Sequence, residues 1–391
     1  MFRFYTAGES HGQCLVAIVE GLPGGMAVDQ SAINHEMRRR QLGYGRGARM
    51  KIESDVVEIL SGVRDGRSLG SPMALRIENK DWENWQGIMA VERNETVQNL
   101  RAVTRPRPGH ADLAGALKYH THDMRDILER ASARETAARV AVGALAKLFL
   151  REFGIEVYSH VIAIGPVAVS DDQMASLSLI ELQARAEGSI VRCADPQKSA
   201  AMKDVIDQAK ANGDTVGGVF EVIAHGLPAG LGSHTQWDRK LDGRLAQALM
   251  SIPAIKAVAI GDGIGTAALP GSQVHDEIFY DSGQQAFYRN TNRAGGLEGG
   301  ITNGCDLRLR GFVKPISTLR RALQSVDVIS KAPSPAAFER SDICVVPAAG
   351  VVGEAMVSLV LTEAMLEKFG GDSIAETRRN ADAYLATVRQ Y

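Results

Sequence analysis

The chain has 391 residues, of which 45% are hydrophobic and 23% are charged, and its formal net charge at pH 7 is -2. A chain of this length can bury a large core, in one domain or in two. The near-neutral charge excludes a general electrostatic attraction to nucleic acid or to anionic membranes, although it allows local basic clusters.

The four cysteines lie far apart, without Cys-x-x-Cys spacing and without histidines at the spacing of a zinc site. We therefore expect free thiols in a reducing compartment and no metal site. The N-terminus lacks the apolar core of a secretory signal, and we expect no apolar run long enough to span a bilayer. The expected location is the cytoplasm, with neither membrane nor nucleic acid as a partner.

Residues 8–12, Gly-Glu-Ser-His-Gly, lie between an expected strand at 2–6 and an apolar run at 14–19. Glycine permits tight turns, and histidine changes charge near neutral pH. The segment also fits Gly-x-Ser-x-Gly, the nucleophile elbow of serine hydrolases, which takes an oxyanion donor from an earlier loop. Too few residues precede the segment for such a loop, so His11 is favoured, and a serine hydrolase using Ser10 is the alternative.

A basic, glycine-rich segment at 38–50 follows an expected helix that Asp29 or Ser31 would cap. A charge run is usually a solvated surface loop. Here the glycines favour another interpretation, because guanidinium groups on a backbone that can fold back form a clamp for phosphate and carboxylate groups. The arginines of this segment are Arg38, Arg39, Arg40, Arg46 and Arg49.

Strands are expected within 51–78 and a long surface loop over 79–94. In the next segment, Arg-Pro-Arg-Pro-Gly-His-Ala-Asp at 105–112, the prolines and the glycine place His110 on a bend. The neighbouring arginines and Asp112 suit His110 to binding an anion and donating a proton. A solvated loop histidine is the plainer alternative.

Ser132-Ala-Arg-Glu135 predicts a capping box at the head of a long helix that ends near Gly154. With Arg130 and Arg134 beside it, this helix start is a second candidate anion site. An ordinary capped helix is an equally good interpretation.

The rest of the chain forms blocks of strands and helices. Strands are expected at 157–169, 217–225, 255–261 and 343–346, and helices at 170–211, 238–250 and 353–369, the last ending at Gly370. Blocks rather than strict alternation favour an α+β layered sandwich. Similar strand and helix pairs near 238–261 and 343–369 suggest a single large domain, 1–391, with two related halves.

Three further segments carry candidate ligand-binding groups. A loop rich in glycine and asparagine at 290–304 either approaches a ligand or is a flexible linker. Lys-Pro-Ile-Ser-Thr at 314–318 adds a cation and two hydroxyls, and Asp342 precedes an expected strand as a turn residue or a base. There is no Walker loop and no complete dinucleotide fingerprint. The whole set indicates proton transfer on a multiply anionic substrate beside a phosphate-bearing cofactor.

These segments, in this order, resemble the chorismate synthase family. They are 8–12, 39–46, 107–112, 130–136, 295–304, 314–318 and 340–342. The resemblance implies a carbon–oxygen lyase that eliminates phosphate, in a trans-1,4 sense, from 5-enolpyruvylshikimate 3-phosphate. The product is chorismate, in the shikimate pathway of aromatic amino acid biosynthesis. The resemblance also implies a β-α-β sandwich with internal duplication, a homotetramer, and a requirement for reduced FMN without net redox change.

The resemblance further implies roles for individual residues. His11 would be a proton donor to the reduced flavin, His110 would act on the departing phosphate, and Asp342 would help the flavin accept the ring proton. Residues for substrate anions would be Arg40, Arg46, Arg49, Arg107 and Arg134, of which Arg40 and Arg46 are also given to NADP. Flavin contacts would be Arg130, Ala131, Ser132, Pro253, Ala254, Gly299, Lys314, Pro315, Ile316, Ser317, Thr318 and Arg340. Pro253 departs from the family, in which an amide residue is common at this position.

No reductase-like segment or nicotinamide fingerprint is visible in the sequence. We therefore expect NADPH to act only indirectly, as a source of electrons through an external reductase. The alternative of another class is a non-catalytic flavin or phosphosugar binder, in which the histidines only hold anions.

Overall fold

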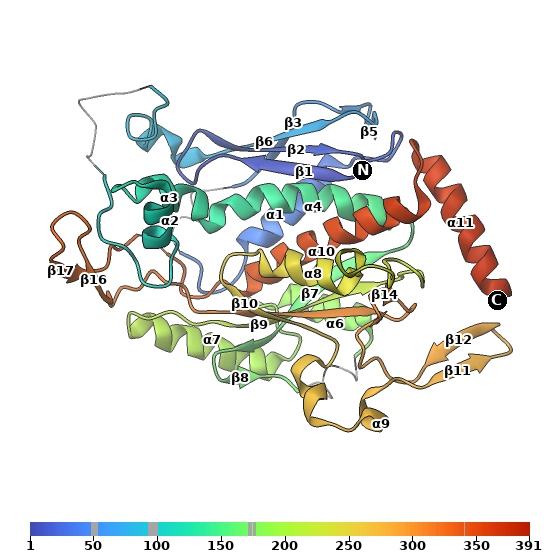
Figure 1. The fold of residues 1–391 in the computed structure, drawn as a ribbon. Helices are drawn as coiled ribbons and strands as arrows, with labels where there is room; N and C mark the ends of the chain where they lie inside the picture. Colours follow the sequence, from blue (N-terminus) through green and yellow to red (C-terminus); the bar gives the residue numbers. More distant parts are fainter. Residues whose placement is uncertain (48–53, 93–100, 171–173, 175–176, 340) are drawn as a thin grey trace.

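The structure is a computed structural model that describes residues 1–391 except 48–53, 93–100, 171–173, 175–176 and 340. Two antiparallel sheets enclose a layer of long helices (Figure 1). This arrangement is the α+β layered sandwich that the sequence predicts. Both sheets turn apolar faces toward the helices between them, so that one hydrophobic core runs through all three layers.

The first sheet, at the top of Figure 1, has the strand order β1-β2-β6-β3. Its strands are β1 (Arg3–Ala7), β2 (Cys14–Glu20), β6 (Met73–Glu78) and β3 (Val57–Ile59), with a small ladder of β4 (Val63–Arg64) and β5 (Arg67–Ser68) between β3 and β6. Helices α1 (Gln30–Gln41) and α4 (Thr136–Arg151) cover its inner face. Asp29 caps α1 by accepting from the backbone N–H of Ser31, which confirms the predicted cap.

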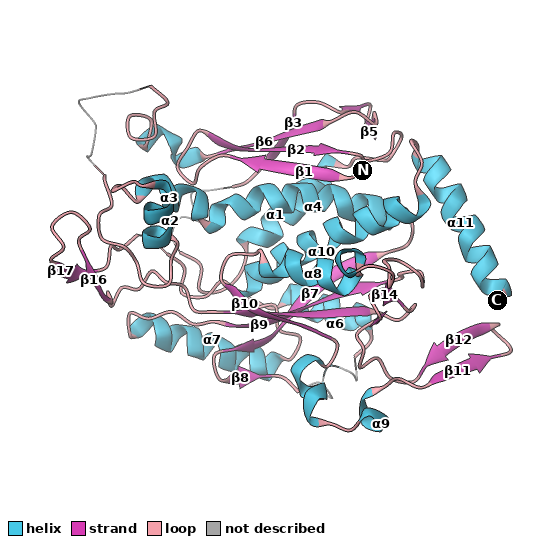
Figure 2. Ribbon diagram, viewed as in Figure 1, coloured by secondary structure: helices cyan, strands magenta, loops and turns pink. Residues whose placement is uncertain are grey.

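The second sheet has the strand order β10-β15-β9-β7-β8. Its strands are β10 (Ile255–Ile260), β15 (Leu307–Val313), β9 (Gly218–His225), β7 (Glu156–Ile164) and β8 (Val167–Ala168). Helices α8 (Leu241–Met250) and α10 (Val346–Phe369) pack against it from the helix layer, and α6 (Leu179–Gly188) and α7 (Pro196–Ala211) pack at its β7–β8 side. Figure 2 shows α4, α10 and α8 lying side by side between the two sheets.

The two sheets share one topology. Apart from inserted elements such as β8, α6 and α7, which lie between β7 and β9 in the second half, each half has two strands, a helix, two further strands and a second helix in sequence. The four strands lie in the sheet in the order first, second, fourth, third. All pairings among these strands are antiparallel. The repeat supports our proposal that the chain is one domain made of two related halves.

The predicted strand at 343–346 is wrong, because α10 begins at Val346, seven residues before the expected helix start at 353. This helix is buried on nearly all sides, so its apolar residues surround the axis and a short apolar run cannot distinguish it from a strand. Gly370 ends the helix with a φ of 58°, as predicted.

Helix α10 also corrects the expectation about apolar runs. Over 18 residues its mean hydropathy is 1.6, which is sufficient in length and composition for a membrane span. In this structure 89% of that window is buried inside the protein, and the helix forms the centre of the core.

The predicted capping box at 132–135 is wrong in detail. The Ser132 hydroxyl accepts from the backbone N–H of Arg134, within the 3₁₀ turn η3 (Ala133–Glu135) that precedes α4. The Glu135 carboxylate turns away and pairs with Arg139, four residues later. An ion pair at i,i+4 spacing therefore takes the side chain that the box requires.

Several elements lie where the sequence predicts none. They are the helices α2 (Asp112–Tyr119), α3 (Arg125–Ala131), α9 (Gly271–Val274) and α11 (Ile374–Gln390), the 3₁₀ turns η2 (Lys80–Asn84) and η5 (Gly263–Ala268), and the hairpins β11 (Ile278–Asp281) to β12 (Ala286–Arg289), β13 (Leu297–Glu298) to β14 (Ile301–Thr302) and β16 (Gln324–Val326) to β17 (Pro333–Pro335). The expected helix at 238–250 is divided into the 3₁₀ turn η4 (Trp237–Arg239) and α8. The expected surface loop at 79–94 is also wrong in part, because η2 leads into Trp85, which is buried.

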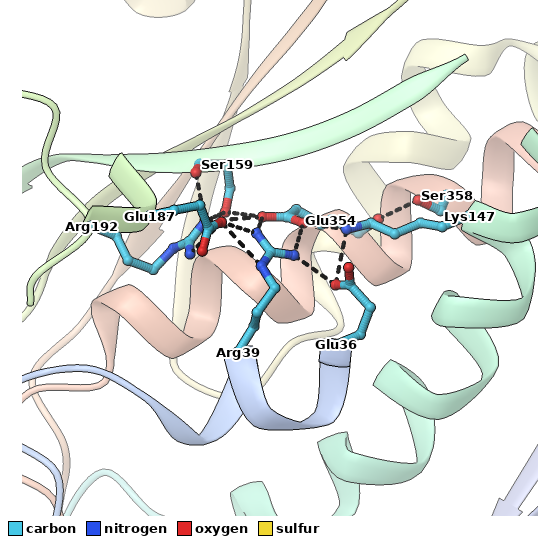
Figure 3. A network of polar contacts seen from close by, with 8 residues as sticks. All are labelled: Glu36, Arg39, Lys147, Ser159, Glu187, Arg192, Glu354 and Ser358. Atoms are coloured by element: carbon cyan, nitrogen blue, oxygen red, sulfur yellow. Dashed lines mark hydrogen bonds and ion pairs between the residues drawn. The ribbon is translucent and has the colours of Figure 1, made fainter. Parts of the chain in front are cut away.

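A buried ion network joins the two halves (Figure 3). The Glu354 side chain, fully buried in α10, accepts from both terminal nitrogens of Arg39 in α1, at 2.7 and 2.8 Å. It also binds Lys147 of α4 and the hydroxyl of Ser159 in β7. Burial raises the pKa of Glu354, but attraction to Arg39 and Lys147 outweighs it and holds this pKa well below the usual range.

Candidate functional site

A cavity of about 910 Å³ opens where the end of α1, the starts of α2 and α10, and α3 meet. This volume is at the upper end of what small-ligand sites occupy. Among the described residues its lining carries eight cations and two carboxylates. The cations are Arg40, Arg46, Arg101, Arg105, Arg107, Arg125, Arg134 and Lys314, and the carboxylates are Glu339 and Asp342. Such a lining suits a multiply anionic ligand.

Most of the residues singled out in the sequence meet at this cavity. Its lining includes His11, His110, Asp342, Arg40, Arg46, Arg107, Arg134, Ala131, Ser132, Pro253, Ala254, Lys314, Ile316, Ser317 and Thr318. They come from segments spread over more than 300 positions, so the fold, and not local sequence, brings them together.

Five of the expected residues are not placed at the cavity. Arg130 donates to the backbone oxygens of Thr6 and Gly8 and so ties α3 to the end of β1. Pro315 is exposed outside the lining, and Gly299 lies in the turn between β13 and β14. Arg49 and Arg340 lie outside the described residues.

His11 is held from two directions at the cavity wall. Its Nδ1 lies 2.9 Å from both carboxylate oxygens of Glu129, and its backbone N–H donates to Glu129 Oε2 at 2.8 Å. The imidazole stacks on the indole of Trp85, with 3.9 Å between ring centroids and 24° between planes. Glu129 thus engages the Nδ1 side of the ring, and Trp85 covers one of its faces.

His110 has a closely similar arrangement. Its Nδ1 lies 2.5 Å from Oδ1 of Asp112, which is fully buried, and Arg107 donates to both oxygens of the same carboxylate. Burial raises the pKa of Asp112, but its hydrogen bonds to His110 and Arg107 hold that pKa far below the usual range. Arg107 also donates to the hydroxyl of Thr318 at 3.0 Å.

The arginines Arg40, Arg46 and Arg134 also line the cavity. Arg40 and Arg134 are both buried and share the carboxylate of Asp55, at 3.4 and 2.5 Å. Burial, together with the neighbouring charges of Arg134 and Arg46, lowers the pKa of Arg40 to about 10, even though Asp55 raises it. Arg40 still carries its charge at neutral pH, and a bound anion would relieve the repulsion between it and its two neighbours.

Asp342 connects two of the sequence segments. Its Oδ1 accepts from the backbone N–H of Gly47 at 2.6 Å, and its Oδ2 lies 3.4 Å from Nε of Arg46. The loop after α1 is thereby fastened to the residues that precede α10. The sequence predicts a strand after Asp342, but the element that follows it is the helix α10.

Another part of the lining is formed by Pro253, Ala254, Lys314 and 316–318. Ala254 has a φ of 71°, a conformation that is costly for a residue with a side chain and that is concentrated at binding sites. Its carbonyl accepts from the backbone N–H of Lys314 at 2.9 Å, and Lys314 Nζ donates to the oxygen of Gly109 at 2.8 Å. Burial and the charge of Lys256 lower the pKa of Lys314. A cation, the hydroxyls of 317–318 and exposed backbone groups fit an anionic ligand.

No sequence motif marks Trp85, Arg125, Glu129 or Asp55 as belonging to this site. Arg125 and Glu129 have the i,i+4 spacing of a helical ion pair, but no helix was predicted there. Trp85 stood in an expected surface loop. Asp55 could be recognised only through the arginines that it neutralises.

The structure also bears on the alternative that uses Ser10. This residue is buried, and its hydroxyl accepts from that of Ser132 at 3.1 Å. The nearest candidate base, His11, directs Nδ1 toward Glu129. The arrangement favours His11 over Ser10 as the residue to consider for proton transfer.

Comparison with known proteins identifies the family. The profile of the family described as chorismate synthase matches residues 2–366. A chorismate synthase from Solibacter usitatus is 59% identical and one from Carboxydothermus hydrogenoformans is 56% identical, in each case over the whole of both chains. A solved structure titled "Crystal Structure of Chorismate Synthase" superposes with a TM-score of 0.81 at 44% identity, covering 100% of this chain and 99% of the other. The chain therefore belongs to the chorismate synthase family.

Proposed function

We propose that the cavity eliminates phosphate from 5-enolpyruvylshikimate 3-phosphate to give chorismate, so that the protein is a carbon–oxygen lyase of aromatic amino acid biosynthesis. The observation that carries this proposal is the pairing of two carboxylate-bound histidines with a cluster of arginines in one cavity. In this elimination a ring C–H bond and the C–O bond to phosphate break, a second ring double bond forms, and phosphate leaves with the electron pair of the broken C–O bond.

The arginines bind and orient the substrate. Arg40, Arg46, Arg107 and Arg134 can hold phosphate and carboxylate oxygens in bidentate fashion, and Arg49 belongs to the same proposed set. Arg40 and Arg134 are fixed through Asp55, so they are positioned before any ligand arrives. Fixed charges of this kind stabilise developing charge without rearranging.

His110 is placed to act on the leaving phosphate. Its ring is fixed by Asp112, and Arg107, which shares that carboxylate, lies 3.1 Å from the ring. An imidazole in this position can give a proton to a phosphate oxygen while Arg107 neutralises the remaining charge.

The wall formed by Ala131, Ser132, Pro253, Ala254 and 314–318 fits FMN, with Arg130, Gly299 and Arg340 as further proposed contacts. Reduced FMN, when bound, would supply an electron-rich ring that assists the loss of phosphate and is left without net oxidation. We assign to His11 the transfer of a proton through Nε2, which takes up and releases that proton while Nδ1 keeps its own hydrogen, and to the Asp342 carboxylate the role of a base. Pro253 offers no side-chain donor, so its contact is apolar or through the backbone.

We further propose a homotetramer in the cytoplasm whose flavin is reduced by another protein, with NADPH as the indirect electron source and without a working NADP site at Arg40 and Arg46. Exposed aromatic side chains on the β11–β12 hairpin, such as Tyr280 and Phe287, support contacts between subunits.

An anaerobic assay tests the proposed function. The protein should release phosphate from 5-enolpyruvylshikimate 3-phosphate with reduced FMN, and should release none with oxidised FMN or without flavin. NADPH with oxidised FMN should restore turnover only when a separate flavin reductase is added. If phosphate is not released with reduced FMN, the chain is a non-catalytic binder.

A further inference from the structure

We propose that Glu129 is a positioning residue for His11: it holds the Nδ1 proton and fixes the ring so that Nε2 faces the cavity. The inference rests on the proposed role of His11 in the reaction. It concerns a residue that does not line the cavity and so cannot itself touch the substrate or the flavin.

The contacts of Glu129 leave its carboxylate one arrangement. Its side chain is 1% exposed, and its carboxylate contacts the backbone N–H and Nδ1 of His11 and the guanidinium of Arg125. Oε2 accepts from the backbone N–H of His11, and Oε1 accepts from Arg125 at 3.1 Å. An ionised carboxylate can only accept, so the imidazole nitrogen between the two oxygens carries a hydrogen.

The charge on Glu129 is maintained by its surroundings. Burial raises the pKa of Glu129, but the hydrogen bonds from His11 and Arg125 lower it by more. The net shift of this pKa is therefore downward. Arg125 is itself held by the carbonyl of Arg101 and the carboxylate of Glu339. The carboxylate of Glu129 therefore stays ionised at neutral pH, and Arg125 is its fixed partner besides His11.

Trp85 supplies the second constraint. Its indole covers one face of the His11 ring, and its own N–H donates to Asp81 at 3.2 Å. A ring that is stacked on one face and bonded at Nδ1 has no freedom to exchange its two nitrogens. Fixing the tautomer of a histidine in this way is what the buried carboxylate does in serine protease triads.

The recurrence of the arrangement at His110 is independent support. There Asp112, two residues after His110, contacts Nδ1, and Arg107, five residues before Asp112, anchors the carboxylate. Glu129 reaches His11 across 118 positions. An imidazole, a carboxylate and a guanidinium therefore meet at both histidines of the cavity. At His110 they come from one short segment, and at His11 the fold brings them together, so the geometry points to a shared requirement of the site.

The test combines two replacements with a matched control. Glu129→Met keeps the length of the side chain but removes the acceptor, whereas Glu129→Gln keeps an acceptor and removes the charge. Glu221→Gln is the control, because Glu221 is also 1% exposed and binds a histidine, His160, and two arginines, yet lies outside the cavity. Each replacement is made in wild type, and those at Glu129 are repeated in His11→Ala.

Turnover with reduced FMN is the first measurement. We expect kcat to fall about 10- to 100-fold in both Glu129 variants, the loss typical of residues that orient a reacting group. KM should change little. In the His11→Ala background the same replacements should leave kcat within about twofold, because a residue that acts through His11 has nothing left to act on. Glu221→Gln should retain wild-type kcat.

The second measurement needs no flavin. In deuterated protein labelled with ¹⁵N-histidine, the His11 signals are identified by their absence from His11→Ala. Wild type should show Nδ1 as the hydrogen-bearing nitrogen, and Glu129→Met should show a mixture of the two forms. If Glu129→Met does not fold, Glu129→Gln should show the loss of kcat and a changed Nδ1 signal.

Three results would overturn the inference: wild-type kcat in the Glu129 variants, an equal loss in the His11→Ala background, or unchanged His11 signals. Failure of the underlying proposal looks different, because His11→Ala itself would then keep wild-type turnover.

Discussion

At the scale of single residues, the site depends on how charged groups are buried. His11 and His110 each have a buried carboxylate on Nδ1, Glu129 and Asp112 respectively, and each carboxylate is bound by an arginine. Carboxylate, imidazole and guanidinium can be buried together because each satisfies the hydrogen bonds of the next. The result is two histidines whose rings are oriented by a buried carboxylate at Nδ1.

Replacing Asp112 with asparagine tests the energetic side of this arrangement. Asp112→Asn leaves Arg107 buried beside a neutral amide, and breaking a buried ion pair from one side typically costs about 3 kcal/mol. We expect a loss of this order in the free energy of unfolding, measured in urea with FMN absent. Asp207→Asn, in an exposed pair with Lys203, should change the midpoint little. Equal midpoints of urea unfolding for the two variants would show that the Asp112 ion pair does not stabilise the fold.

At the scale of elements, the two central helices approach so closely that one contact requires glycine. A Cβ added to Gly143 in α4 would lie 2.3 Å from the Cβ of Ala355 and 2.6 Å from its Cα in α10. No side-chain adjustment can relieve a contact with backbone, so a larger residue would force the helices apart. Because α4 and α10 belong to different halves, this contact sets how the halves pack.

Gly143→Ala should therefore destabilise the protein in spite of the better helix propensity of alanine. We expect a loss of about 1–3 kcal/mol, as for other overpacked cores, measured by urea unfolding. Gly243→Ala is the matched control, since Gly243 lies in α8 with nothing within 4 Å of an added Cβ. There alanine should raise stability by about 0.5–1 kcal/mol. The prediction is refuted by a gain of stability at both positions.

The sequence predicts elements well where local signals act alone. Asp29 caps α1 and Gly370 ends α10, because a polar cap and a left-handed glycine are decided by neighbouring atoms. It fails where a distant partner decides. Helix α10 resembles a strand at its start because it is buried all round, and Ser132-x-x-Glu135 is no capping box because Arg139 takes the glutamate.

At the scale of the whole molecule, the charge network of Figure 3 joins the halves inside the core. Arg39 and Lys147 come from the first half, whereas Glu354, Ser159 and Arg192 come from the second. Arg39 immediately precedes Arg40 of the cavity. The network thus fixes the end of α1, and with it an arginine of the site, to the centre of α10.

The network should make stability depend on acid. The pKa of Glu354 is depressed in the folded state, so its contribution is present above the ordinary glutamate value of about 4.3 and is lost as the pH falls below it. Glu354→Gln should lower the unfolding free energy at pH 7 by about 3–5 kcal/mol. In this variant the unfolding free energy should also fall less between neutral and acid pH than it does in wild type. Urea unfolding at a series of pH values measures both.

Glu58→Gln is the control for this experiment, because Glu58 pairs with Arg76 on the surface. It should leave the pH dependence of stability unchanged. An identical acid dependence in Glu354→Gln and wild type would contradict the assignment of that dependence to the network.

The site was predictable from sequence to the extent that reactive residues lie in short, unusual segments. His11, His110 and the arginines of 38–50 stand out by their glycine and proline neighbours. Their partners do not. Glu129, Trp85 and Asp55 sit in ordinary surroundings and become part of the site only when the fold brings them within a few ångströms of a histidine or an arginine.

The most direct test of the account is the turnover of His11→Ala in the anaerobic assay with reduced FMN. His225→Ala is its control, because His225 also binds a carboxylate through Nδ1, that of Asp306, but lies outside the cavity. We predict that His11→Ala binds FMN as wild type does and loses at least about 100-fold in kcat, while His225→Ala retains full activity. Unchanged phosphate release by His11→Ala would contradict the central claim.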